Sequence, residues 1–316
     1  MMHNDCPPHI SRDVETMLTQ LWDHHPRTDG APFRVPCNHP CSLMRDDMSK
    51  LTGHPHWVSP KVDGVRMFLL FSFVDDLDYA TFVNRAGKIT PVNIHAPLEA
   101  HSGTLLDGEL VTDPTTGVAT YLVFDAVAVN GYSLKSKPQS ERMAGVVRMV
   151  ASLRVEDPRL RVKPKRWFNF ENANLSEVAS SVEGIPTDGF IFVPECGKPI
   201  RPGPQRDHFK WKPVSHHTID MVWRDGCLWL ERAGVPERAT ALGVVGFELG
   251  SGGTLPPEEG NVVEVTLQPA PAPAPIAQWR AHFVRVRDDK ATPNDMKVAE
   301  LTLQNIVENI RLDELR

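Results

Sequence analysis

The stretch from Trp57 to Asn130 constrains the fold most strongly. It consists of short β-branched and aromatic runs, which are separated by turn signals such as RAGK and DPTTG. This pattern predicts a mostly antiparallel sheet. Apolar residues at helical spacing predict helices at 11–24, 138–153 and about 174–183, and further strands are expected in RVKPKRWF, GFIFV and HFKWK. The chain is therefore expected to have a mixed α+β fold.

The length and a change of pattern after Pro213 indicate two domains. A chain of 316 residues, 41% of them hydrophobic, can bury two cores. Beyond Pro213, the hairpin pattern TIDMVWRDGCLWLERAG and the strand GNVVEVTLQ indicate a small β-unit, and the Pro-Ala run at 269–275 indicates a spacer. We expect a first domain at 1–213 and a second at 214–316.

Capping residues predict where two helices begin. Ser11 is the candidate N-cap of the first helix. Near the C-terminus, Thr292 is the candidate cap and Pro293 suits the first helical position. An apolar stripe from Met296 to Ile310 then predicts a helix that packs on its domain.

Charge and cysteine usage exclude some broad classes. The net charge is −6, with 34 basic and 40 acidic residues, so bulk electrostatic coating of nucleic acid is not expected, although a local basic cleft is compatible. The five cysteines are an odd number, and no apolar stretch resembles a signal peptide or a membrane span. We expect an intracellular protein with reduced thiols and no membrane attachment.

Two lysine-bearing segments predict a phosphate site. KVDGVR places Lys61 and Arg66 just before an apolar strand. A lysine becomes a nucleophile only without its proton, and neighbouring cations disfavour the protonated form. In FKWKP, strand alternation predicts that Lys210 and Lys212 share one face while the two aromatic residues share the other. The alternative for this strand is a sheet edge with two solvated lysines.

Two acids are candidate metal ligands. Glu109 lies in TLLDGELV, and Asp188 precedes Gly189 and an apolar strand. Carboxylates at strand ends need a cation or a metal as partner. Release of pyrophosphate from a triphosphate requires Mg²⁺ or Mn²⁺, which oxygen ligands hold. The alternatives are a structural salt bridge for either acid and, for Glu109, a contact to the sugar or to the lysine.

Six segments occur in one fixed order: KVDGVR, TLLDGELV, YLVFDAVAVNG, TDGFIFVP, DHFKWKP and RVRDDKATPN. In this order they resemble the covalent nucleotidyltransferases, which comprise the mRNA capping guanylyltransferases and the polynucleotide ligases, from about residue 40 to the C-terminus. The resemblance implies an ATP-grasp-like, ligase-type nucleotidyltransferase domain and a C-terminal OB-fold β-barrel. Three features favour a capping enzyme over a ligase. Asp188 stands where ligases usually have a glutamate, Asp220 occupies the acidic position of the capping version of the fifth segment, and Pro-Asn ends the sixth segment.

The resemblance implies a reaction in two steps. Lys61 attacks the α-phosphate of GTP to give enzyme-GMP, which then passes to the 5′-diphosphate end of RNA. The resemblance assigns to catalysis Lys61, Arg66, Lys210, Lys212, Arg287 and Lys290. It assigns to GTP binding Asp63, Arg85, Glu109, Phe124, Lys165, Asp220 and Arg285.

Three of these assignments have a specific expected role. Phe124 is expected to stack on the purine, the alternative being an ordinary core phenylalanine. Lys165 is expected to donate to guanine O6, with Lys163 as the competing candidate. The cations of RVRDDK are expected to act on the β- and γ-phosphates when the OB-fold closes.

Two other functions stay open: a DNA or RNA ligase that acts through lysyl-AMP, and an inactive nucleotide-binding scaffold. The sequence has no cysteine-phosphatase signature and no glycine-rich methyltransferase start. We therefore expect separate RNA triphosphatase and cap methyltransferase chains. The expected location is the nucleus for a cellular eukaryotic enzyme, and the cytoplasm or the virion for a viral one.

Overall fold

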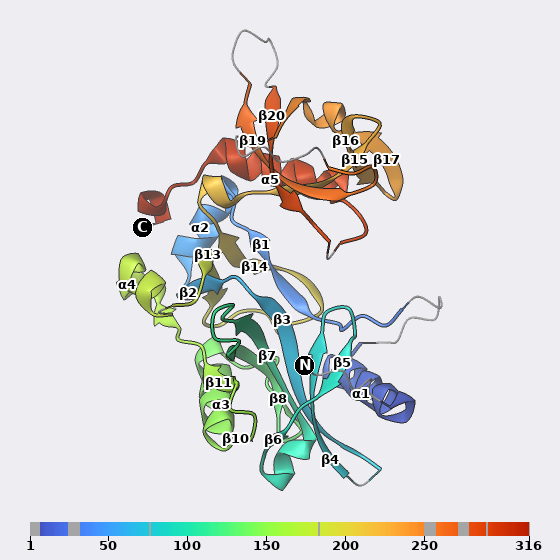
Figure 1. The fold of residues 1–316 in the computed structure, drawn as a ribbon. Coiled ribbons are helices and arrows are strands. Elements are labelled where there is room, and N and C mark those ends of the chain that lie inside the picture. Colours follow the sequence, from blue (N-terminus) through green and yellow to red (C-terminus); the bar gives the residue numbers. More distant parts are fainter. Residues whose placement is uncertain are drawn as a thin grey trace. The chain divides into compact units, whose positions relative to one another are not determined.

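The computed structural model describes residues 7–24, 32–75, 77–182, 184–249, 257–270, 278–288 and 290–315. Most of the predicted Pro-Ala spacer lies outside these residues. The chain forms two compact units (Figure 1). The first unit comprises Met1–Leu43 and Asp47–Trp211, and the second comprises Met44–Asp46 and Lys212–Arg316. No helix within the described residues is long and apolar enough to cross a membrane.

The first unit is built on two larger sheets. The five-stranded sheet has the order β1-β14-β13-β2-β12, and the seven-stranded sheet has the order β11-β8-β7-β3-β4-β5, with β9 paired to β8. Its strands are β1 (Asn38–Ser42), β2 (His56–Val62), β3 (Val65–Val74), β4 (Leu77–Asn84), β5 (Ile89–Pro91), β6 (Ile94–His95), β7 (Ser102–Thr112), β8 (Ala119–Val129), β9 (Tyr132–Ser133), β10 (Arg154–Val155), β11 (Leu160–Pro164), β12 (Phe168–Asn169), β13 (Thr187–Pro194) and β14 (Gly203–Trp211). Most pairings are antiparallel; β1 with β14 and β11 with β8 are parallel.

The second unit contains a six-stranded sheet of order β17-β16-β15-β19-β20-β18, which curls into a half-barrel (Figure 1). Its strands are β15 (Ile219–Arg224), β16 (Cys227–Arg232), β17 (Val235–Arg238), β18 (Val244–Glu248), β19 (Val262–Pro269) and β20 (Trp279–Val286). The β15–β16 hairpin turns at Asp225 and Gly226, which both have positive φ, as a two-residue hairpin requires. The predicted α+β class with antiparallel sheets is confirmed.

The helices are α1 (Pro8–Leu21), α2 (Met48–Gly53), α3 (Gln139–Ala151), α4 (Leu175–Ser180) and α5 (Met296–Glu308). Both predicted caps are wrong. Pro7 is the N-cap residue of α1, so Ser11 lies inside that helix. Asp295 caps α5 by accepting a hydrogen bond from the backbone of Lys297, so Thr292 and Pro293 precede the cap. A carboxylate at this position satisfies a backbone N–H that the helix leaves free.

Two motif glycines are required by close packing. A Cβ on Gly64, in the turn between β2 and β3, would lie 2.7 Å from the carbonyl oxygen of Leu110. A Cβ on Gly108 would lie 2.5 Å from the ring of Tyr121. The hydroxyl of Tyr121 also donates to the carbonyl of Met67, which ties β8 to β3. These glycines let β3, β7 and β8 approach closely, and this places Arg66 and Glu109 beside each other as a cross-strand pair.

Candidate active site

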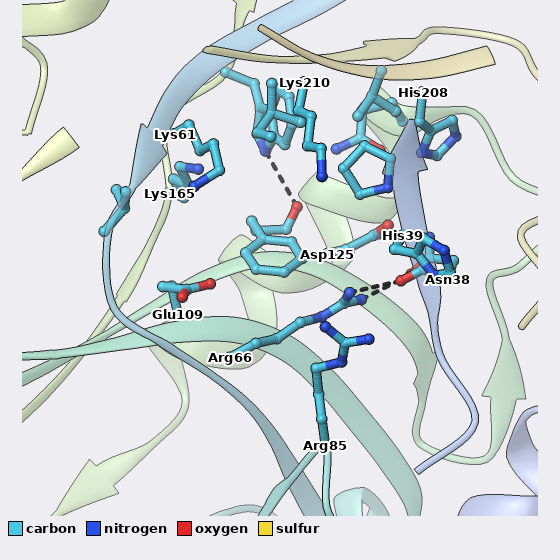
Figure 2. A pocket seen from close by; sticks show the side chains of 17 residues that line it. Asn38, His39, Lys61, Arg66, Arg85, Glu109, Asp125, Lys165, His208 and Lys210 are labelled. Atoms are coloured by element: carbon cyan, nitrogen blue, oxygen red, sulfur yellow. Dashed lines mark hydrogen bonds between the residues drawn. The ribbon is translucent and has the colours of Figure 1, made fainter. Parts of the chain in front are cut away.

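A cavity of about 320 Å³ opens between residues of the two larger sheets of the first unit (Figure 2). Its lining residues come from the five-stranded sheet, from the seven-stranded sheet and the turn after β4, and from α3 and the segment between β11 and β12. They are Asn38, His39, Pro40, Lys61, Val62, Ile191, Val193, His208 and Lys210; Arg66, Arg85, Glu109, Phe124 and Asp125; and Gln139, Lys165 and Trp167.

Lys61, which lines this cavity, is hydrogen-bonded to a carboxylate. Its Nζ donates a hydrogen bond to Asp188 Oδ1 over 2.7 Å, and both side chains are mostly buried. The sequence predicts cations beside Lys61, whereas the structure places the Asp188 carboxylate against its ammonium group. The pairing of β13 with β2 shifts register between Thr187 and Phe190, and a bulge of this kind re-aims the side chains next to it. The ion pair holds Nζ in one position.

Glu109 and Lys165 have strongly shifted acidities. Burial raises the pKa of Glu109 to about 7, although Lys165 and Lys61 oppose the shift. Burial lowers the pKa of Lys165 to about 8, and the positive charge of Lys61 adds to this, while Glu109 opposes it. An acid with a raised pKa and a base with a lowered pKa in one cavity are typical of a functional site. Lys163 is exposed and does not line the cavity, so Lys165 is the candidate there.

Glu109 makes the stability of the ligand-free protein depend on pH. Its pKa is about 7 in the folded protein and 4.5 without burial, so between these values the folded state binds more protons than the unfolded state. Stability therefore falls as the pH rises through this window. We expect the free energy of unfolding to drop by about 1–3 kcal/mol between about pH 5 and about pH 8, and this drop to be missing in Glu109→Gln. Urea unfolding of both proteins measures it; the same pH dependence in both would exclude Glu109 as the cause.

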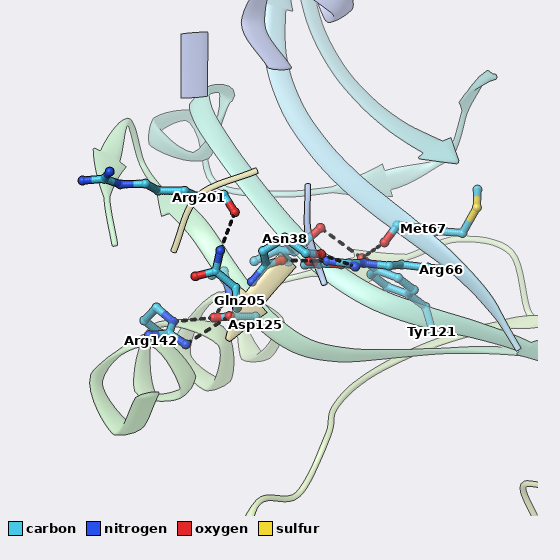
Figure 3. Close-up of polar contacts among 11 residues, drawn as sticks. Asn38, Arg66, Met67, Tyr121, Asp125, Arg142, Arg201 and Gln205 are labelled. Carbon is cyan, nitrogen blue, oxygen red and sulfur yellow. Dashed lines mark hydrogen bonds and ion pairs between the residues drawn. The ribbon is translucent and has the colours of Figure 1, made fainter. Parts of the chain in front are cut away.

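Arg66 is committed to structural partners (Figure 3). It donates to both oxygens of Asp107, over 2.9 and 2.5 Å. It also donates to the backbone carbonyl of Asn38 over 2.6 Å and to its Oδ1 over 2.9 Å. A guanidinium has five N–H groups, so these contacts leave little donor capacity for a substrate. Arg66 ties β1 to β3 and β7, and any direct catalytic role for it stays a prediction.

An aromatic ring forms one wall of the cavity. Phe124 lies 5.5 Å from the Arg66 guanidinium and 5.7 Å from Lys165 Nζ, measured to its ring centroid. Ile191 lines the same cavity from the five-stranded sheet. We call the part of the cavity that Phe124 and Ile191 line the base slot, because aromatic and aliphatic side chains suit the faces of a flat ring.

The predicted pair of lysines at β14 is found for Lys210 but not for Lys212. Lys210 lines the cavity, and Phe209 and Trp211 are buried on the other face, where Trp211 stacks on Phe190 at 5.8 Å between ring centroids. The alternation is thus confirmed for these residues. Lys212 does not belong to it, because β14 ends at Trp211, and Lys212 does not line the cavity.

The remaining predicted residues lie elsewhere. Asp63 is exposed in the turn after β2 and does not line the cavity. In the second unit, Arg287 and Lys290 both pair with the buried carboxylate of Asp220, at 3.0 and 2.5 Å. Arg285 pairs with Glu264 at 2.7 Å. Asp220 therefore holds two of the three cations that the sequence assigns to the leaving phosphates.

Several polar or aromatic cavity residues are not among the predicted site residues, although Asp125 and His208 lie inside recognised segments. They are Asn38, His39, Asp125, Gln139, Trp167 and His208. Asp125 directly follows Phe124, and Trp167 is close to Lys165, so their motifs offered a partial signal. Asn38 and Gln139 lie in no recognised segment, and only the folded chain brings them to the cavity.

A mostly buried lysine held by a carboxylate, beside an aromatic wall and several cations, is an arrangement that suits a nucleotide polyphosphate. The chain belongs to the mRNA capping enzyme family: residues 4–214 match its catalytic domain and residues 249–316 match its C-terminal domain.

Individual relatives carry the same family name. The mRNA-capping enzyme subunit alpha of Saccharomyces cerevisiae is 29% identical over 247 residues, which is 68% of this chain and 52% of that protein. The mRNA-capping enzyme of Danio rerio is 30% identical over 201 residues, 58% of this chain and 33% of that protein. The Schizosaccharomyces pombe subunit alpha is 23% identical and covers 90% of this chain and 80% of that protein. The chain spans about half of the length of several curated relatives that it matches, the Saccharomyces cerevisiae protein among them.

Solved structures with a similar arrangement include DNA ligases. The mycobacterial DNA ligase D complexed with ATP and MES is 14% identical, with a TM-score of 0.44 and coverage of 80% of this chain and 96% of that one. The ATP-dependent DNA ligase from bacteriophage T7 in complex with ATP is also 14% identical, with a TM-score of 0.41 and coverage of 80% and 98%.

Proposed function

We propose that the chain is a GTP:RNA guanylyltransferase that works through a covalent lysyl-GMP. The observation that carries the proposal is the position of Lys61, mostly buried in the cavity and hydrogen-bonded to Asp188 over 2.7 Å. Membership of the capping enzyme family supports guanylate transfer over ligation.

In the first step, Lys61 Nζ attacks the α-phosphorus of GTP. A P–N bond forms, the bond from the α-phosphorus to the bridging oxygen breaks, and pyrophosphate leaves. Nζ has to lose a proton before it attacks, and the Asp188 carboxylate is its hydrogen-bonded acceptor. Lys210 and Arg85 line the same cavity and supply positive charge for the phosphates.

A divalent metal ion fits this site if it binds together with the nucleotide phosphates. Within the part of the chain that the structure describes, no three His, Cys, Asp or Glu residues are grouped as metal ligands. Mg²⁺ is commonly held by one or two carboxylates together with substrate phosphates. The candidates are Glu109, which lines the cavity, and Asp188, which contacts Lys61. Asp125 also lines the cavity, but Arg142 donates to both of its oxygens. When bound, Mg²⁺ or Mn²⁺ neutralises charge on the leaving phosphates.

In the second step, the 5′-diphosphate end of RNA takes the GMP from Lys61 and forms the cap. RNA triphosphatase and cap methyltransferase activities are assigned to separate chains. The location follows the source, with the nucleus proposed for a cellular eukaryotic enzyme and the cytoplasm or virion for a viral one.

Nucleotide choice tests the proposal. We expect α-labelled GTP with Mg²⁺ or Mn²⁺ to label the protein covalently, and ATP to label it at least about 100-fold less. Adenine has an amino group at the purine 6-position, and this donor cannot accept a hydrogen bond from Lys165. Unlabelled diphosphate-ended RNA should then remove the label. Labelling by ATP together with sealing of nicked strands would identify a ligase, and no labelling by either nucleotide would identify a scaffold.

A further inference from the structure

One residue of the cavity has a donor without a partner. Gln139 lines the cavity and is 1% exposed. Its Nε2 is buried and has no hydrogen-bond acceptor among the described residues. An unsatisfied buried donor destabilises the folded protein, because it has lost its hydrogen bond to water. A ligand that supplies an acceptor would remove this cost, so the orphaned group points to a ligand.

The side-chain amide of Gln139 is oriented by the ion pair of Arg142 and Asp125. Arg142 donates to Gln139 Oε1. Arg142 also donates to both oxygens of Asp125, over 2.7 and 3.2 Å (Figure 3). The backbone N–H of Gln139 donates to the carbonyl of Glu195 over 2.9 Å. Because a guanidinium only donates, it fixes which end of the amide is the oxygen. Nε2 is therefore the end left for a ligand.

The same arrangement recurs at Asn38. Asp107 holds Arg66, and Arg66 donates to Asn38 Oδ1 over 2.9 Å. Both amides line the cavity, and each has its oxygen fixed by an arginine that an aspartate clamps. Of the two, only the Gln139 amide nitrogen is fully buried and unpaired. The observations therefore single out Gln139.

The groups around Gln139 suit an uncharged part of a ligand. His208 lines the cavity and feels the charges of Asp207, Arg142 and Asp125, so it lies near the pair that orients Gln139. Burial lowers the pKa of His208 to about 4, so its imidazole is neutral at physiological pH. A neutral imidazole and an amide can match the donors and acceptors of a base edge, whereas phosphates favour the cationic residues Lys61, Lys210 and Arg85.

We propose that Gln139 is a specificity-determining residue, and that its Nε2 donates a hydrogen bond to an acceptor atom of the purine base held in the base slot. The inference rests on the proposed function in one respect, namely that a purine nucleotide occupies the cavity. It assigns the base a second contact besides Lys165, from an element outside the recognised segments.

Substitution of Gln139 tests the contact. Gln139→Leu removes the donor, and we expect kcat/KM for enzyme-GMP formation from GTP to fall about 10- to 100-fold. Gln139→Glu can still accept from Arg142 but presents only acceptors to the ligand, so we expect an equal or larger loss. The matched control is Gln205→Leu, because Gln205 is also buried but donates to the Arg201 carbonyl over 2.9 Å and does not line the cavity. It should change kcat/KM by less than about threefold.

Base analogues identify the acceptor. The 7-deaza and 3-deaza analogues of GTP lack N7 and N3, and 2-aminopurine riboside triphosphate lacks O6. For the analogue without the contacted atom, Gln139→Leu and wild type should be equally slow. If the substitution costs the same factor with GTP and with all three analogues, or if it costs nothing, the proposal is overturned.

Equilibrium binding of GTP to Lys61→Ala separates this outcome from failure of the proposed function. Binding that weakens when Gln139→Leu is added supports the inference even without turnover, and unchanged binding overturns it. Absence of labelling in the wild type contradicts the guanylyltransferase assignment alone.

Discussion

Lys61→Ala is expected to lower enzyme-GMP formation at least about 1,000-fold, because it removes the atom that bonds to phosphorus. Lys61→Arg should be equally inactive. Its guanidinium can keep the ion pair with Asp188, but it stays protonated and is a poor nucleophile. The loss therefore reports chemistry and not the loss of a charge. Gel detection of covalent label from α-labelled GTP measures it.

Lys163→Ala is the matched control for this loss, since Lys163 is exposed and does not line the cavity. It should keep labelling within about twofold of wild type. A Lys61→Ala protein that still becomes labelled would show that another residue forms the covalent bond to GMP.

Arg287→Ala or Lys290→Ala should slow enzyme-GMP formation about 10- to 100-fold and change GMP transfer to diphosphate-ended RNA by less than about threefold. Cations that stabilise departing pyrophosphate matter only while it departs. The buried Asp220 carboxylate holds both residues, at 3.0 and 2.5 Å, so we expect them to act as an oriented pair. Single-turnover rates of the two half-reactions, the second started from preformed enzyme-GMP, measure the difference.

Arg232→Ala is the control in the same unit, since Arg232 also forms two ion pairs, with Glu237 and Glu300, but on an exposed surface. It should leave both half-reactions unchanged, as surface pairs contribute little. Thermal unfolding of each variant shows whether the second unit stays folded. Equal losses in both half-reactions for Arg287→Ala would assign the cluster to RNA binding or to stability.

The parts of the fold that local pattern determines were predictable. The helix α3 and most strands of the two larger sheets follow from apolar spacing and turn residues, which act within a few positions of each other. The strand β1 was not among the expected strands. Helix starts were not predictable in this way. The cap of α5 is Asp295 because its carboxylate reaches the backbone of Lys297, and Thr292 is equally suitable by residue type. The end of β14 depends on its partner strand, since the pairing of β13 with β14 includes Phe190 with Trp211.

The site could be predicted where chemistry and motif coincide. Lys61, Glu109, Phe124, Lys165 and Lys210 all line the cavity, as do Arg66 and Arg85. The sequence could not show the partners of these residues. The contact between Lys61 and Asp188 spans 127 positions, and that between Arg66 and Asn38 spans 28, so both depend on sheet register. An arginine that is occupied by Asp107 and Asn38 looks, in sequence, the same as one that binds a substrate.

The central claim is that Lys61 carries the nucleotide, and Lys165 is the sharpest competitor. Both lysines line the cavity, and Lys165 has a pKa of about 8, so part of its population is deprotonated at neutral pH. Wild-type protein incubated with GTP and a divalent metal should be digested under conditions that preserve P–N bonds and analysed by tandem mass spectrometry. The account predicts GMP on Lys61. GMP on Lys165 or any other residue would contradict it.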